Sequence, residues 1–261
     1  MEASYRPENY WSDVAAQIRS RNGRADVAGT DDPYFRHKRR KFLSRFLARL
    51  EVRDRVVAEL GCGPGGNLAI LAKRGPKKLI GLDISQSMLE LAAAATAEHQ
   101  SIVELHKTDG LRLPLPDQSV DLAYTVTVLQ HTTDPAMFQS LVAELCRISR
   151  DQVVLMEDTG DEEDPVSPTR DHIPRKPRLY RETVERHGFR AVSSHEFLEL
   201  RASRWLYFRA WRLAPEPVYG SRAPLRVRAV MGLGLLVTRA LDRIIPEVGD
   251  LTRMEFRRAP K

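Results

Sequence analysis

A short apolar run that leads into a glycine-rich turn constrains the fold of this chain more than any other feature. Residues 56–60 are Val-Val-Ala-Glu-Leu, which predicts a short buried strand, and glycines follow at positions 61, 63 and 65. An apolar helix is predicted to begin near Asn67. A strand, a glycine turn and a helix in this order are typical of the nucleotide-binding turn of doubly wound α/β folds, because glycine lets the backbone approach a ligand closely.

Two carboxylates narrow the kind of ligand. The glycines are spaced G-x-G-x-G, but Gly66 also completes the G-x-G-x-x-G of a dinucleotide fold, so the glycines alone do not decide. Glu59 stands two residues before the first glycine, where it would repel a pyrophosphate and attract a cationic amino group. Asp83 ends the next predicted strand, 79–83, and is placed to accept hydrogen bonds from two ribose hydroxyls. The two acids together favour a cofactor with an amino group and a ribose.

With these residues the chain resembles the class I S-adenosylmethionine (SAM)-dependent methyltransferases, in particular the small-molecule group with an E/D-x-G-x-G signature. The resemblance continues in the same order through residues 108–110, 113–117, 119–122 and 128–131. It implies an α/β fold, with a Rossmann-like sheet of seven mostly parallel strands, helices on both faces and an antiparallel last strand. The alternative is an unrelated Rossmann-like turn.

The order of the predicted elements agrees with such a sheet, because strands and helices alternate. Further strands are predicted at 102–106, 120–126, 153–156, 191–200 and 251–257, and further helices at 7–20, 33–50, 86–98, 135–148 and 178–187. The predicted parts are an N-terminal helical cap (1–50), a SAM-binding Rossmann-like core (51–200), a basic helical insertion (201–250), and the last strand of the core with a tail (251–261). The insertion between strands six and seven departs from the family pattern, which has a short connection there.

Two segments allow more than one interpretation. Residues 157–177 are acidic and then proline-rich, which predicts a long loop on the ligand side of the sheet, either a substrate lid or a solvated loop. In the insertion, arginines interleave with Trp205, Tyr207, Phe208 and Trp211. This composition is typical of a membrane-interface helix, an anionic-ligand site or a partner surface, and an ordinary packed helix pair is the fourth alternative.

The charge is unevenly distributed along the chain. The 261 residues carry 41 Lys and Arg against 35 Asp and Glu, a net +6. Residues 201–261 hold 13 basic and 5 acidic residues, a net +8, so residues 1–200 come to −2. A nearly neutral core weakens the case for an enzyme that acts on nucleic acid, because such an enzyme is expected to carry basic residues around its site.

We expect a cytoplasmic protein, because the sequence shows neither an apolar signal segment nor a run of about 20 apolar residues. Peripheral contact with the inner face of the membrane through 201–250 is the alternative. Cys62 and Cys146 suggest neither a disulfide nor a metal site. The oligomeric state, monomer or homodimer, is left open.

The resemblance assigns the cofactor contacts position by position. The methionine part of SAM is expected beside Glu59, Gly61, Cys62, Gly63, Gly65 and Thr125, the ribose beside Asp83, and the adenine beside Ile84, Asp109, Gly110 and Leu111. In similar methyltransferases the N-terminal helices fold over the cofactor, so Tyr34, Arg36 or Lys38 could reach the methionine carboxylate. A solvated basic face is the alternative interpretation of those residues.

His131 is the one candidate catalytic base, because it follows the fourth strand where similar enzymes open their substrate pocket. Glu157 or Asp158, at the end of the neighbouring strand, could orient it. A purely structural histidine is the alternative. Tyr180 and Arg181 are weaker candidates for substrate contact.

The leading functional hypothesis is methyl transfer from SAM to a small-molecule acceptor by in-line displacement, at a hydroxyl of a sugar or secondary metabolite. No metal is expected to take part. The alternatives are the same chemistry on a lipid or lipid-linked glycan at the membrane surface, a nucleic-acid methyltransferase, and a non-catalytic cofactor-binding protein. The sequence contains no N/D-P-P-Y/F amino-methylation motif after the fourth strand, which weighs against the nucleic-acid alternative.

Overall fold

A computed structural model describes residues 6–21, 27–160, 171–192, 195–198, 200–215, 219–245 and 251–260. These residues form one eight-stranded sheet with the strand order β3-β2-β1-β4-β5-β8-β6, and β7 also pairs with β8. The strands are β1 (Val56–Leu60), β2 (Lys78–Asp83), β3 (Val103–Lys107), β4 (Val120–Val126), β5 (Ser149–Asp158), β6 (Phe189–Ala191), β7 (Glu196–Phe197) and β8 (Leu251–Arg258). Strands β1 to β5 pair in parallel, and β8 is antiparallel to its neighbours, as predicted.

The prediction of one continuous sixth strand over 191–200 is wrong, and the sheet therefore has eight strands instead of seven. The register against β8 gives the reason. Ala191 pairs with Phe256, whereas Glu196 pairs with Arg253. Five residue steps on one strand thus face three steps on β8, and an unbroken ladder needs equal numbers of steps. Two short strands, β6 and β7, therefore stand where one was predicted.

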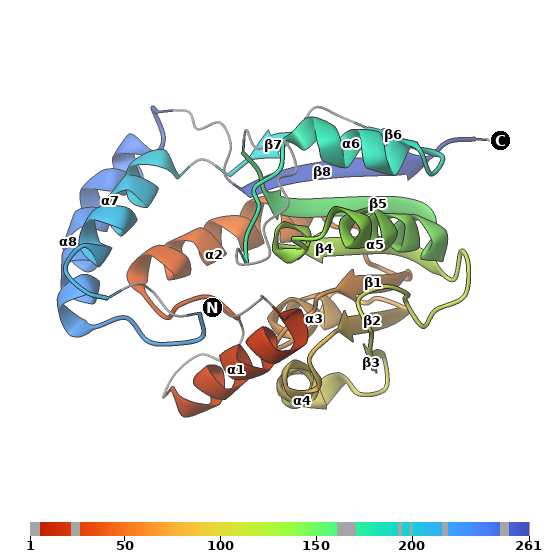
Figure 1. Cartoon of the computed structure of the whole chain (residues 1–261), viewed down its shortest axis with the longest axis horizontal. Helices are drawn as coiled ribbons and strands as arrows, with labels where there is room; N and C mark the ends of the chain where they lie inside the picture. The colour runs from red at the N-terminus through yellow and green to blue at the C-terminus, as the bar shows by residue number, and fades with distance from the viewer. Residues whose placement is uncertain are drawn as a thin grey trace.

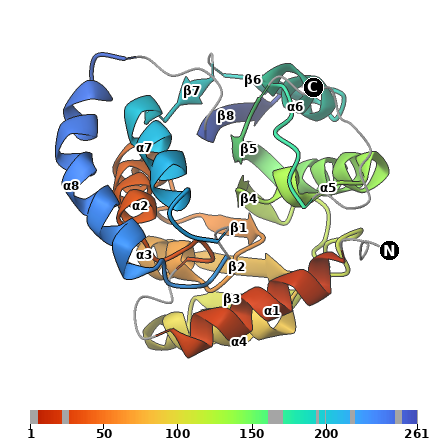
Figure 2. The same cartoon turned by 60° about the vertical axis from the view of Figure 1, so that its left-hand side comes forward.

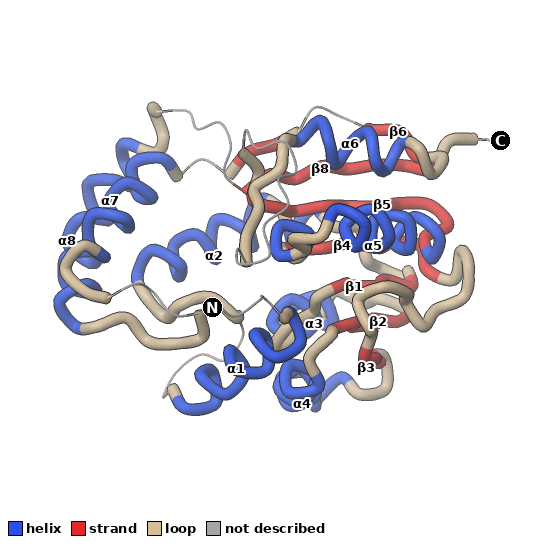
Figure 3. Tube along the Cα trace, viewed as in Figure 1, coloured by secondary structure: helices blue, strands red, loops and turns tan. Residues whose placement is uncertain are grey.

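Helices lie on both faces of the sheet (Figure 3). They are α1 (Pro7–Ser20), α2 (Pro33–Arg45), α3 (Gly66–Ala72), α4 (Gln86–Ala95), α5 (Pro135–Ile148), α6 (Pro177–Glu185), α7 (Arg201–Trp211) and α8 (Leu225–Leu241), with short 3-10 turns at Leu47–Arg49, Ala97–His99 and Leu129–His131. The side chains of Asp32, Ser85 and Asp134 cap α2, α4 and α5, since each accepts backbone N–H groups in the first turn of its helix. The predicted helix 33–50 is shorter, because α2 ends at Arg45.

Successive residues of the central strands point to opposite faces of the sheet and pack into two separate apolar cores. Ala58 on β1 packs with the α5 and α6 side chains Phe138 and Val184 on one face. Val57, its neighbour, packs on the opposite face with Phe46, which follows α2. Both faces are covered because strand side chains alternate and both sets are apolar, the pattern of a sheet buried on two sides. Figure 1 shows α5 and α6 lying along one face of this sheet.

The remaining helices are arranged around one end of the sheet. Helix α1 packs on α4 through Val14, Ala15, Ile18 and Met88. Helices α7 and α8 pack on each other and on α2, and Figures 1 and 2 show this pair at the end of the molecule, outside α2. None of the helices in the described residues is long and apolar enough to cross a membrane.

Candidate active site

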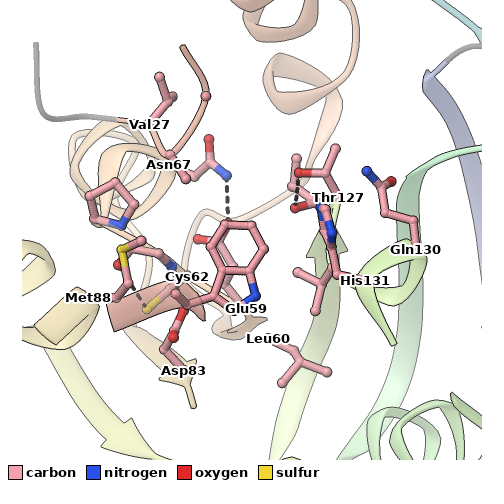
Figure 4. Close-up of a pocket in the computed structure, with 18 of the residues that line it drawn as sticks. Val27, Glu59, Leu60, Cys62, Asn67, Asp83, Met88, Thr127, Gln130 and His131 are labelled. Carbon is pink, nitrogen blue, oxygen red and sulfur yellow. Dashed lines mark hydrogen bonds between the residues drawn. The ribbon is translucent and has the colours of Figure 1, made fainter. Parts of the chain in front are cut away.

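A cavity of about 290 Å³ lies at the carboxyl ends of the central strands. Its floor is the glycine turn after β1, and Asp158 at the end of β5 forms part of its wall. Asp83 at the end of β2 and Thr127 after β4 also line it (Figure 4). Residues from α1, from α2 and from the segment before α8 close it from above. Parallel strands with helices on both faces place their ligand sites at this edge, which agrees with the position of the cavity.

The three glycines of the turn have different roles. All three have positive φ angles, +69° at Gly61, +51° at Gly63 and +81° at Gly65. A Cβ on Gly63 would meet no atom within 4 Å, so the backbone there is open to the cavity. A Cβ on Gly65 would lie 2.7 Å from the Cα of Ala92 in α4, and Gly65 does not line the cavity. Gly65 therefore permits close packing of α4, in contrast to the predicted cofactor contact.

Glu59 is fully buried and bonded on both carboxylate oxygens. Asn67 Nδ2 donates to Oε1 at 2.6 Å, and the Tyr124 hydroxyl donates to Oε2 at 2.8 Å. Burial raises the pKa of Glu59 to about 7, although both hydrogen bonds favour the ionised form and lower it. A buried carboxylate whose pKa lies so high gains stability from a cation in the adjoining cavity.

Asp83 is also buried and faces the cavity. Its carboxylate accepts the backbone N–H groups of Gly63 at 2.8 Å and Ser85 at 2.9 Å, which leaves lone pairs for further donors. Burial raises the pKa of this carboxyl to about 6. Next to Asp83, the apolar side chains of Ile84 and Met88 line the cavity together with Gly110.

Besides Gly65, three predicted cofactor residues do not line the cavity. Asp109 is exposed, and its carboxylate accepts the backbone N–H groups of Leu111 and Arg112 instead of facing the cavity. Leu111 is also exposed. Thr125 is completely buried within β4, and its hydroxyl donates to Glu157 Oε1 at 2.5 Å. The other predicted residues, Glu59, Gly61, Cys62, Gly63, Asp83, Ile84 and Gly110, do line it.

Helix α2 contributes two basic side chains to the cavity wall. Lys38 Nζ lies 3.2 Å from Asp158 Oδ1, and Arg39 Nη1 donates to Asn67 Oδ1 at 2.5 Å. Arg39 was not singled out by the sequence, because nothing in a run of basic residues distinguishes the one that faces inward. The other two candidates point elsewhere. Tyr34 packs against Tyr207, and Arg36 pairs with Asp31.

His131 lines the cavity and is almost fully buried. Its Nδ1 lies 2.6 Å from the backbone carbonyl of Asp171. A carbonyl oxygen only accepts, so Nδ1 carries the hydrogen and Nε2 of the neutral ring is an acceptor; no described residue bonds to Nε2. Burial lowers the pKa of His131 to about 4, which keeps the ring neutral near pH 7. The prediction that Glu157 or Asp158 orients this ring is wrong.

Those two acids hold other groups. Glu157 Oε2 accepts the backbone N–H groups of Val128 and Leu129 at 2.9 and 3.0 Å and so fixes the turn that carries His131. Burial raises the pKa of Glu157 to about 8. The charge of Lys38 and hydrogen bonding hold the pKa of Asp158 well below its usual range, although burial opposes this.

The backbone at Thr127 is strained. This β-branched residue, between β4 and the His131 turn, has a φ of +55° and lines the cavity. Left-handed backbone is unfavourable for such a side chain, and strain of this kind concentrates at functional sites. The conformation is held by a backbone hydrogen bond of 2.8 Å from Thr127 to Met156 on β5.

The last residues of the loop predicted at 157–177, residues 171–177, pack against the protein, whereas residues 161–170 lie outside the described part of the chain. Arg175 is fully buried and donates to the carbonyls of Leu129 at 2.8 Å and Thr132 at 2.6 Å. Tyr180 is buried against Phe138. Neither Tyr180 nor Arg181 lines the cavity. Residues 171–177 therefore support the His131 turn from outside.

An aromatic cluster closes the cavity over His131. The ring of Trp11 in α1 meets His131 edge-on at 4.9 Å between centroids, and Tyr219 lies 6.0 Å from His131. Trp11 was not singled out by the sequence, because its contact with His131 joins the first helix to a turn over a hundred residues later. Tyr219 was missed, since it belongs to the insertion and reaches the site only through the tertiary fold. In the described part of the chain, no group of three or more His, Cys, Asp or Glu side chains could hold a metal ion.

The cavity fits a cofactor that carries a positive charge and ribose hydroxyls. The open backbone at Gly63 leaves room for such a cofactor. Glu59 and Asp83 are buried carboxyls with raised pKa values, and a positive charge or hydroxyl donors beside them would lower those pKa values. Residues 57–152 match the family model described as a methyltransferase domain. This match and the methyltransferase relatives support a class I SAM-dependent methyltransferase. The cofactor of these methyltransferases is SAM.

Named relatives match parts of this chain. A trans-aconitate 2-methyltransferase of Azoarcus sp. (strain BH72) is 31% identical over 175 residues, 66% of this chain and 62% of the relative. A malonyl-[acyl-carrier protein] O-methyltransferase of Marinomonas sp. (strain MWYL1) is 38% identical over 110 residues, 41% of this chain and 38% of the relative. The match thus spans less than two thirds of either relative.

Solved methyltransferases share the fold of this one. The magnesium protoporphyrin IX methyltransferase from Synechocystis PCC 6803, solved with bound SAH, has a TM-score of 0.59 at 14% identity. It covers 97% of this chain, and 98% of the solved chain is matched.

Proposed function

We propose that this protein transfers the methyl group of SAM to a hydroxyl oxygen of a small-molecule acceptor bound beside His131. One observation carries the proposal. His131 is a buried, neutral imidazole whose Nδ1 is held by the Asp171 carbonyl, and its ring lines the same cavity as the glycine turn. An acceptor-only nitrogen in that position favours a ligand with an O–H donor.

The cofactor half of the cavity would be built by Gly63, Asp83 and the residues around Glu59. Arg39 is placed to pair with the methionine carboxylate while it bonds to Asn67, and Asn67 links it to the buried carboxylate of Glu59. When bound, SAM supplies a methyl group on a positively charged sulfur, which is already activated for displacement. The main task of these residues is therefore to position the two reactants, which can supply effective molarities of roughly 10⁵–10⁸ M.

In the acceptor half, His131 would orient the hydroxyl by accepting its proton in a hydrogen bond at Nε2. With a pKa of about 4, lowered by burial, it is a weak base, so orientation contributes more than full proton removal. The ring would stay in the acceptor form throughout the neutral range. We expect no loss of activity from His131 protonation above about pH 5, which a profile of kcat/KM against pH measures.

The charges around the cavity favour a hydroxyl over a carboxylate acceptor. A carboxylate would need a cation to pair with, but Lys38 already pairs with Asp158, and Arg39 lies at the cofactor end on Asn67. The name of the Marinomonas relative specifies an O-methyltransferase, which supports oxygen as the acceptor atom. A sugar or secondary metabolite remains our proposal for the acceptor.

The test incubates the protein with methyl-labelled SAM and a small-molecule extract of its host, followed by phase partition and mass analysis. We expect the label in an aqueous compound of low mass, as a methyl ether. Label confined to the organic phase would replace this acceptor with a lipid or a lipid-linked glycan. Label in nucleic acid, or no transfer at all by a protein that binds SAM, would contradict the proposal.

Substitution of His131 tests its role separately. His131→Ala should lower turnover at least about tenfold and leave the affinity for S-adenosylhomocysteine unchanged, because only the acceptor loses its partner. His172→Ala is the matched control, since His172 lies 5.6 Å from His131, ring to ring, and does not line the cavity. Wild-type turnover in His131→Ala would remove this residue from the mechanism.

A further inference from the structure

Helix α8 has two apolar faces, and only one of them is covered. Val227, Met231, Leu235 and Thr238 are buried against the rest of the protein. On the opposite face, Leu233 and Leu236 are 75% and 72% exposed, and Val237 is also exposed. No charged residue occurs between Ala229 and Thr238. A surface helix normally has a polar outer face, so this exposed apolar stripe needs a partner.

Helix α7 adds aromatic side chains to the same end of the molecule. Trp205 and Phe208 are 60% and 58% exposed. The guanidinium of Arg209 lies 5.2 Å from the Trp205 ring centre, and Arg204 lies 5.8 Å from that of Phe208. Figure 2 shows α7 and α8 side by side at the outer end of the molecule. Tryptophan beside arginine is a favoured combination at a membrane–water interface.

The charge of the α7–α8 surface has one sign. Residues 201–245 contain nine arginines and two acids, Glu216 and Asp242. Glu216 lies outside the described residues, and Asp242 is buried, where it accepts the backbone N–H groups of Ala202 and Ser203. Arg226 and Arg243 are exposed near the two ends of the apolar stripe. The described part of this surface therefore combines an apolar centre with a basic rim.

We propose that the α7–α8 surface docks the protein on an anionic phospholipid bilayer. The exposed face of α8 would sink among the acyl chains, and the arginines would pair with lipid phosphates, for which guanidinium groups are well suited. Because its other face packs on the protein, α8 would lie in the plane of the bilayer. A second copy of the chain fits less well, since an interface built from this face would bring the arginine rims of two copies together.

Docking would place the bilayer beside the helix that supplies the cavity wall. Helices α7 and α8 pack on α2, which carries Lys38 and Arg39, and Tyr219 between α7 and α8 lines the cavity. The docking proposal does not depend on the proposed reaction, because vesicle binding can be measured without SAM or an acceptor.

The test sediments the full chain with vesicles of phosphatidylcholine containing phosphatidylglycerol, and with vesicles of phosphatidylcholine alone, at low and high salt. We expect binding to the anionic vesicles that weakens as salt rises. A Leu233→Ser/Leu236→Ser variant should lose about tenfold or more in partition, and Arg226→Gln/Arg243→Gln should lose most of its salt dependence. Val192→Ser, a change at an exposed apolar residue outside α7 and α8, is the control and should bind normally.

Tryptophan fluorescence gives a second readout. Binding should shift the emission of the wild-type protein to shorter wavelength, and Trp205→Phe should lose most of that shift, because Trp205 is the exposed indole of the surface. Absence of binding to anionic vesicles at low salt would overturn the proposal. Equal binding by the Leu233→Ser/Leu236→Ser variant would also overturn it. The proposal would likewise fail if the wild-type protein does not bind vesicles but forms a concentration-dependent dimer that this variant abolishes.

Discussion

The hydrogen bond from Tyr124 to Glu59 should stabilise the protein to an extent that depends on pH. Tyr124→Phe removes only the hydroxyl that donates to Glu59 Oε2 at 2.8 Å, and both side chains are buried, so water does not replace it. A hydrogen bond to a charged group contributes about 1.5–3 kcal/mol and one between neutral groups about 0.5–1.5 kcal/mol. The loss should therefore be larger when Glu59 is ionised.

The sign of the pH dependence follows from the raised pKa. Burial raises the pKa of Glu59 from 4.5 to about 7, so between these values the folded state holds a proton that the unfolded state has released. Stability from this group is present below pH 4.5 and is lost as pH rises through about 7. The Tyr124 hydroxyl favours the ionised carboxylate, so its removal raises the pKa of Glu59 further and steepens that loss.

The assay is thermal and urea unfolding of the cofactor-free protein at about pH 6 and about pH 8.5, on either side of the Glu59 pKa. We expect Tyr124→Phe to lose about 1 kcal/mol at the lower pH and about 2–3 kcal/mol at the higher one. At roughly 2–4 °C per kcal/mol, the higher value is a fall in Tm of about 4–12 °C. In a Glu59→Gln background the Tyr124→Phe loss should no longer change with pH. An equal loss at both pH values in the parent protein would refute the reasoning.

Three further substitutions test the packing of the site. Gly65→Ala combines left-handed backbone with a contact of 2.7 Å to Ala92, so it should destabilise the protein by about 2–5 kcal/mol in urea unfolding. At Gly63 an added Cβ would meet no atom within 4 Å, so Gly63→Ala should cost only about 1–2 kcal/mol of stability. Gly63→Ala should instead weaken S-adenosylhomocysteine binding at least about tenfold in calorimetry. Reversed effects of the two glycine changes would contradict the roles given to them. Arg175→Met leaves the carbonyls of Leu129 and Thr132 unpaired and should lose about 3 kcal/mol. The exposed Arg186→Met is its control, and an equally stable Arg175→Met would show that the buried guanidinium does not support the His131 turn.

The sequence was sufficient for features that depend on neighbouring residues. The strand and glycine turn at 56–66 and the strand at 120–126 appear in the structure as predicted. Each rests on backbone geometry or apolar patterning within a few residues, which a sequence displays directly.

Features that depend on distant partners were beyond the sequence. Glycines 63 and 65 look alike in a motif, but only the packing of α4 assigns one to a ligand cavity and the other to a helix contact. The sixth strand splits because its register is set by β8, about sixty residues later in the chain.

At the acceptor end of the site, too, some features could be predicted from the sequence and others depend on the tertiary structure. His131 could be named as a candidate from its place after the fourth strand, but its tautomer is set by a carbonyl forty residues away and its surroundings by Trp11 and Tyr219. The sequence by itself determined the cofactor-binding turn, because that turn is local. The tertiary structure alone decided which side chains share the cavity, because burial and hydrogen bonding are properties of residues brought together from different parts of the chain.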